Sequence, residues 1–148
     1  IIRVSPPTVE LEMEHGGTSI GSGVIKALQL LDRRKNEYKD AGVDYFQPWM
    51  VLMTDGQPTD DTHIEISQDV SNLVSNKKLT VFPIGIGKGA DMSVLAMFSP
   101  KRSPLRLKGL RFKEFFEWLS KSIAATSRST PGEKVSLNTD GIKGWSEL

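Results

Sequence analysis

The chain has 148 residues, the usual size of one domain, and its 38% hydrophobic and 25% charged residues are typical of a globular protein rather than a disordered one. A net charge of +1 identifies no class of partner and gives no reason to expect nucleic-acid or membrane binding. The lack of cysteine excludes a disulfide scaffold and cysteine catalysis, and it fits a cytoplasmic location. No apolar run approaches the roughly 20 residues of a membrane span.

The first elements are a short extended segment and a helix. Residues 8–14 alternate apolar and glutamate side chains, which predicts a short edge strand, with a structured loop as the alternative because Pro6 and Pro7 precede it. Thr18 or Ser19 is expected to cap the following helix, which should end near Gly42.

The middle of the chain alternates strands and helices. Residues 49–53 are an uninterrupted apolar run, as expected for a strand that is buried on both faces. Asp60 or Asp61 is expected to cap the next helix, and the β-branched segment 79–86 predicts a second strand. Asp91 is then expected to open a short helix.

The last elements are a strand, a helix and a tail. A third short strand is predicted at 105–107, and a final amphipathic helix follows it. The apolar face of this helix is expected to comprise Phe112, Phe116, Leu119 and Ile123. Residues 127–148 are polar and punctuated by glycine and proline, which indicates an extended tail. Its packing residues are expected to be Val135, Leu137 and Trp145.

This alternation predicts an α/β fold, a doubly wound, mostly parallel sheet flanked by helices. We expect one domain over residues 1–148, with 127–148 as its C-terminal tail.

Two polar loops are the candidate site. Asp55 directly follows the buried strand and precedes Gly56, so it is expected at the mouth of the sheet, where ligand sites form. Thr18 lies in a polar loop that opens the first helix. Oxygen ligands of this kind suit Mg²⁺, Mn²⁺ or Ca²⁺. The alternatives are structural: Asp55 as a turn residue bonded to its own backbone, and Thr18 or Ser19 as a helix cap.

These two loops resemble those of the von Willebrand factor A (vWA) family, whose metal-ion-dependent adhesion site (MIDAS) uses three loops. By this resemblance, Thr18 matches the second loop and Asp55 the third. Further segments resemble the bacterial TerY-like and YegL-like branch of tellurite-resistance proteins. They are Phe46-Gln-Pro-Trp-Met-Val-Leu-Met-Thr-Asp-Gly, Gly89-Ala-Asp-Met, Phe115-Phe-Glu-Trp-Leu-Ser, Ser127-Arg-Ser-Thr-Pro-Gly and Lys143-Gly-Trp.

The first MIDAS loop, Asp-x-Ser-x-Ser, does not occur in this sequence. In the family that loop follows the central strand, so we expect the chain to be the C-terminal two-thirds of such a domain, without its N-terminal strands. The isolated chain should then bind metal weakly or not at all. The unpaired edge of strand 49–53 would favour self-association.

The resemblance implies a non-enzymatic, metal-dependent protein–protein interaction module of a bacterial, cytoplasmic stress-response or tellurite-resistance system, whose partner supplies an acidic residue to the metal. The alternatives are a Mg²⁺-dependent phosphotransfer domain that uses Asp55, or a structural module that has lost its metal site. A haloacid-dehalogenase-type phosphatase would need an aspartate where Met53 stands, and His15 and His63 form no triad pattern.

Two further motifs are weaker. Residues 85–90 fit the G-x-G-x-x-A variant of a dinucleotide fingerprint, but close turn packing is the favoured reading because the acidic residue expected about 20 positions later is missing. A loose basic cluster spans residues 101–113 and suggests a solvated face or a patch for an acidic protein partner rather than a nucleic-acid site.

Overall fold

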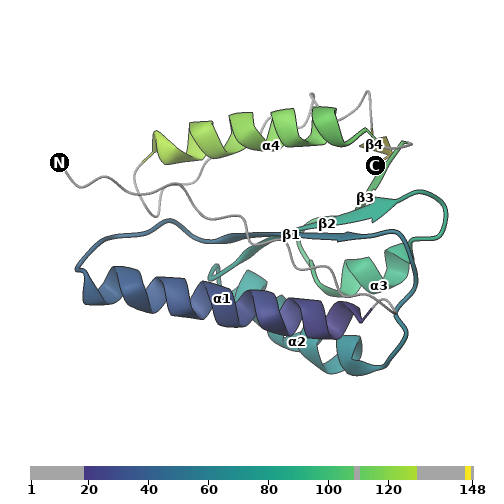
Figure 1. Cartoon of the computed structure of the whole chain (residues 1–148), viewed down its shortest axis with the longest axis horizontal. Helices are drawn as coiled ribbons and strands as arrows, with labels where there is room; N and C mark the ends of the chain where they lie inside the picture. Colours follow the sequence, from purple (N-terminus) through teal and green to yellow (C-terminus); the bar gives the residue numbers. More distant parts are fainter. Residues whose placement is uncertain (1–18, 109–110, 130–145, 148) are drawn as a thin grey trace.

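The computed structural model describes residues 19–108, 111–129 and 146–147. Its elements in chain order are α1 (Ile20–Asp40), β1 (Trp49–Thr54), α2 (Thr62–Ser75), β2 (Thr80–Ile86), α3 (Met92–Met97), β3 (Leu105–Leu107), α4 (Phe112–Ser127) and β4 (Ser146–Glu147). They form three layers, with α1, α2 and α3 on one face of the sheet and α4 on the other (Figure 1). The α/β fold class, with a mostly parallel sheet between helices, is confirmed.

The sheet has the strand order β1-β2-β3-β4. The first three strands are parallel, and the two-residue β4 pairs antiparallel to β3. In the β1–β2 register Trp49 lies opposite Thr80 and Thr54 opposite Gly85, so these strands end at the same edge of the sheet. Within the described ranges, β1 pairs with a neighbour on one side only.

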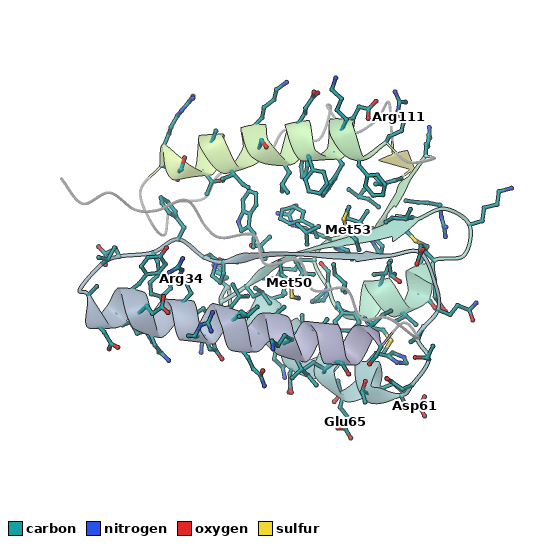
Figure 2. All side chains as sticks on the ribbon, in the orientation of Figure 1. Arg34, Met50, Met53, Asp61, Glu65 and Arg111 are labelled. Carbon is teal, nitrogen blue, oxygen red and sulfur yellow. The ribbon has the colours of Figure 1, made fainter. Side chains whose placement is uncertain are left out.

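The alternation of side chains along β1 divides the core in two. Met50 and Leu52 pack into the cluster beneath α1, α2 and α3, whereas Val51 and Met53 pack into the cluster beneath α4. Figure 2 shows Met50 and Met53 on opposite sides of the sheet. The prediction that this strand is buried on both faces is confirmed only in part. It packs against apolar side chains on both faces, but Val51, Leu52 and Met53 are only partly buried at this edge position.

The predicted apolar face of the last helix is wrong in two positions. Phe116 and Ile123 are each 49% exposed, whereas Phe115 is fully buried and Trp118 is 8% exposed. Two apolar stripes on α4 are offset by one residue, one through Phe116 and one through Phe115. The stripe through Phe115 and Trp118 packs against the sheet. The Trp118 ring lies 5.8 Å from that of Phe82, edge-on, and 6.1 Å from that of Phe115.

The helix ends follow the expected signals. Ser19 is the N-cap of α1, and its hydroxyl accepts from the Ser22 backbone N–H at 3.4 Å. Gly42 terminates the same helix with a φ of 66°, and the Val43 N–H donates to the Tyr38 carbonyl at 2.9 Å. No helix among the described residues is long and apolar enough to cross a membrane.

Several predictions concern residues outside the described ranges. They are the edge strand at 8–14, the metal ligand Thr18, His15, and the packing of the tail through Val135, Leu137 and Trp145.

Candidate functional site

Asp55 lies at the end of β1 with its carboxylate exposed. The turn that carries it is held by its buried neighbour Thr54, whose hydroxyl accepts from the Gly56 N–H at 3.3 Å. The carboxylate of Asp55 itself forms no hydrogen bond or ion pair with another described residue. The alternative of a turn aspartate bonded to its own backbone therefore gains no support, because the threonine performs that role.

The loop after β2 supports the Asp55 loop from the side. A Cβ placed on Gly89 would lie 2.7 Å from the Asp55 carbonyl oxygen, so only glycine allows this approach. The Asp91 N–H also donates to the Gly56 carbonyl at 3.4 Å. The G-x-G-x-x-A pattern at 85–90 thus serves close packing, as favoured from the sequence.

Arg106 fastens this second loop to β3. Its guanidinium donates to the Gly87 carbonyl and, at 3.3 Å, to the Ala90 carbonyl. The sequence placed Arg106 in a basic surface cluster and gave no sign of this contact, because its partners lie 16 and 19 residues away. The ends of β1, β2 and β3 are therefore joined to one another through Gly89, Asp91 and Arg106. We call this connected edge beside Asp55 the rim.

Asp60 joins the beginnings of α1 and α2. Its Oδ2 accepts from the Ser19 hydroxyl at 2.7 Å, across 41 residues, and its Oδ1 accepts from the Thr62 N–H at 3.0 Å and from the Thr62 hydroxyl at 2.5 Å. The Thr62 hydroxyl, followed by that of Ser19, holds the pKa of the Asp60 carboxyl below its usual value. Asp61 occupies the N-cap position of α2 but makes no side-chain cap bond, so Asp60 is the residue that confirms the expected capping.

His63 lies behind these loops, 8% exposed, with Nδ1 2.8 Å from the Asp60 carbonyl oxygen. Asp91 caps α3, and its bonds to Ser93 and Val94 lower its carboxyl pKa. Both carboxylates are therefore engaged in helix starts, and His63 adds a smaller favourable interaction with each.

The oxygen donors at this edge fit part of a divalent-cation site. In ranges 19–108, 111–129 and 146–147, no group of three or more His, Cys, Asp or Glu side chains could hold a metal. Asp55 offers an uncommitted, exposed carboxylate, which is the ligand type that Mg²⁺ and Ca²⁺ prefer. The Ser19 hydroxyl donates to Asp60, and Thr18 remains the predicted second ligand.

A family model for the von Willebrand factor type A domain matches residues 9–113, and the chain belongs to that family. Domains of this family generally mediate protein–protein interactions rather than catalysis, and they commonly bind a divalent metal at a MIDAS. No curated protein and no solved structure matches the chain.

Proposed function

We propose that this chain is a protein-interaction module whose contact with its partner is completed by a divalent cation, Mg²⁺, Mn²⁺ or Ca²⁺. Thr18 and Asp55 are its proposed ligands in this chain. The observation that carries the proposal is the exposed Asp55 carboxylate at the end of a buried parallel strand, without a protein partner among the described residues, in a chain of the vWA family.

The donor chemistry explains why such a site favours recognition. One carboxylate and one neutral hydroxyl leave most positions of an octahedral cation to water and most of its charge uncompensated. A carboxylate from outside the chain lowers the free energy of that cation more than any neutral ligand does. We therefore propose that the partner protein supplies an acidic side chain.

The rim contributes by fixing the direction of Asp55. Gly89 packs against its carbonyl group, and Thr54 holds the turn that follows it. Through Arg106, the position of Gly89 depends in turn on β3. A preformed carboxylate loses less conformational freedom when the cation and the partner bind.

The resemblance to TerY-like and YegL-like proteins supports a bacterial, cytoplasmic setting in a stress-response or tellurite-resistance system. The alternatives are phosphotransfer through Asp55 and a structural module without a working metal site. Release of phosphate from a generic phosphoester in the presence of Mg²⁺, abolished by Asp55→Asn, would support the first of these.

The proposal is tested by calorimetric titration of the 148-residue protein with a short aspartate-containing peptide, in Mn²⁺ or in chelator. We expect the peptide to bind in Mn²⁺ only. Because the coupling between two ligands is reciprocal, the peptide should also tighten the binding of Mn²⁺.

The matched variants are Asp55→Asn and Asp61→Asn, which remove the same charge from the two ends of the loop between β1 and α2. Asp61 is exposed and makes no side-chain cap bond, so its variant controls for charge alone. Asp55→Asn should abolish the metal-dependent part of peptide binding, and Asp61→Asn should leave it within error. Binding that persists in chelator, or equal losses in both variants, would refute the proposal.

A further inference from the structure

A second candidate site lies at the opposite end of the sheet from Asp55. A cavity of about 320 Å³ opens where β2 begins, between the end of α2 and the connection from α3 to β3. Its lining residues are Gln47, Val74, Lys77, Leu79, Thr80, Val81, Ser99, Lys101 and Arg102. Since β2 spans seven residues and a strand rises about 3.3 Å per residue, the two sites are roughly 20 Å apart.

The charge of this cavity is entirely positive. Lys77, Lys101 and Arg102 line it, and no acidic residue does. Within the described part of the chain, none of the three forms a salt bridge with a carboxylate. The Arg102 guanidinium lies 4.9 Å from the centre of the Phe82 ring, which restricts its position, and partial burial lowers its pKa. An anion would compensate this concentration of positive charge.

A buried hydroxyl without a partner lies in the same wall. Ser99 is 5% exposed, and its Oγ is the buried side-chain polar atom in ranges 19–108, 111–129 and 146–147 that has no hydrogen-bond partner. A buried hydroxyl without a partner destabilises a fold, and such atoms are uncommon in native proteins. A ligand or a bound water would supply the missing partner.

Lys77, one of the three cations, ends α2 with a left-handed backbone. Its φ of 57° places it in the left-handed region, at the end of α2, where glycine or asparagine is usual. The Lys78 N–H donates to the Leu73 carbonyl at 2.8 Å, which completes the helix end. The left-handed backbone of Lys77 therefore belongs to the helix end, and its side chain adds positive charge to the cavity.

We propose that this cavity binds the phosphate group of a small phosphorylated molecule, with Arg102, Lys101 and Lys77 as charged donors and Ser99 as a hydroxyl donor. Arg102 offers the planar fork that matches two oxygens of one phosphate. The volume exceeds the needs of a phosphate ion and falls at the lower end of the range of small-molecule sites. Gln47 and Thr80, whose side chains bond at 2.8 Å, provide polar groups for the remainder of the molecule.

The competing explanation is that the cations only stabilise the C-terminus of α2. Lys101 Nζ donates to the Ser75 carbonyl at 3.4 Å, which is a contact of that type. It does not account for Arg102, which lies over Phe82, or for the Ser99 hydroxyl. The two explanations predict different behaviour of the variants.

The test is a titration of the ¹⁵N-labelled protein with inorganic phosphate and with ribose 5-phosphate, in chelator so that the Asp55 site makes no contribution. We expect saturable shifts confined to residues around 77–81 and 99–102, with the sugar phosphate bound more tightly than the free ion. Equal affinities would assign the site to the free ion and overturn the small-molecule part of the proposal. Shifts that spread over the surface without saturation would overturn it entirely.

Three variants separate ligand binding from structure. Arg102→Gln should weaken sugar-phosphate binding by about tenfold or more, the effect of losing one charged hydrogen-bond donor. Ser99→Ala should weaken binding while the melting temperature stays constant or rises. Lys88→Gln is the charge control, since Lys88 is exposed after the opposite end of β2. Equal weakening by Lys88→Gln, or Ser99→Ala with lower stability and unchanged affinity, would refute the site.

Discussion

Two glycines in the first turn of α1, Gly21 and Gly23, should respond in opposite directions to the same substitution by alanine. A Cβ on Gly23 would meet nothing within 4 Å, whereas a Cβ on Gly21 would meet the Thr62 hydroxyl and lie 2.8 Å from Thr62 Cβ and 2.9 Å from its carbonyl carbon. Gly23 is exposed and Gly21 is buried against α2. The two positions share a helix and differ in what faces them.

The magnitudes follow from two opposing terms. Alanine in a helix is more stable than glycine by about 0.5–1 kcal/mol, because glycine loses more conformational freedom on folding. Gly23→Ala should gain this amount. At Gly21 the same gain is outweighed by overpacking, at the upper end of about 1–3 kcal/mol because the Thr62 backbone has to move. We expect a net loss of about 2 kcal/mol.

Thermal and urea unfolding of the two variants measure this difference. A separation of about 3 kcal/mol corresponds to melting temperatures roughly 6–12 °C apart for a chain of this size. Gly21→Ala should also displace Thr62 from Asp60 and thereby weaken the link from Asp60 to Ser19. A shift of the same sign and size in both variants would show that α1 and α2 do not approach at Gly21, and the reasoning would fail.

Four further outcomes are expected. Phe115→Ala should cost about 3–5 kcal/mol in urea unfolding, whereas Phe116→Ala, on the exposed side of α4, should stay within about 1 kcal/mol; similar losses would reverse the assignment of the buried face. The folded-state pKa of Asp60 is lowered, so the Asp60 carboxylate stabilises the fold at pH values above its unfolded pKa of 3.8, and this stabilisation is lost as the pH falls through the folded-state pKa. Asp60→Asn should therefore flatten the acid limb of the stability–pH profile. An unchanged limb would contradict the hydrogen bonds of Asp60 to Thr62 and Ser19. Calorimetry should show that Mg²⁺ alone binds this chain weakly or not at all, since Thr18 and Asp55 are the two ligands proposed in it. Stoichiometric micromolar binding would contradict that ligand set. Light scattering should detect self-association through the edge of β1, which pairs on one side only among the described residues, and a well-folded monomer would contradict it.

Apart from the two-residue β4, which was expected to be part of an extended tail, the elements of the fold were predictable because each carries a local signal. The apolar run 49–53 and the β-branched run 79–86 match β1 and β2 to within one residue at each end. Asp91 and Gly42 mark helix boundaries by chemistry that acts within a few residues. Such signals require no knowledge of the rest of the molecule.

The face of α4 was not predictable in the same way. Phe115 and Phe116 are adjacent aromatic residues, and either can belong to a stripe of helical period. The choice depends on the rings of Phe82 and Trp118, which come from a strand 33 residues earlier and from the next turn of the helix. Tertiary packing decides between two equally periodic readings.

The candidate site shows the same division. Asp55 was placed at the mouth of the sheet from its position after a buried strand, and the structure exposes it there. The contacts that hold its loop were not foreseen. Gly89 and Arg106 act through backbone carbonyls, and a backbone carbonyl carries no sequence signature that would identify its partner.

Because of these long-range contacts, the orientation of Asp55 depends on residues at the carboxyl ends of all three parallel strands. The β2 loop touches the Asp55 carbonyl through Gly89, Arg106 ties that loop to β3, and the Asp91 N–H bonds to Gly56. A change at β3 is therefore expected to alter the proposed metal site without touching a proposed ligand. The cationic cavity adjoins the same β2 strand at its amino end, through Thr80 and Val81, and contains Arg102 three residues before β3. β2 and β3 border both proposed sites. A phosphate-dependent change in Mn²⁺ affinity would reveal coupling between them.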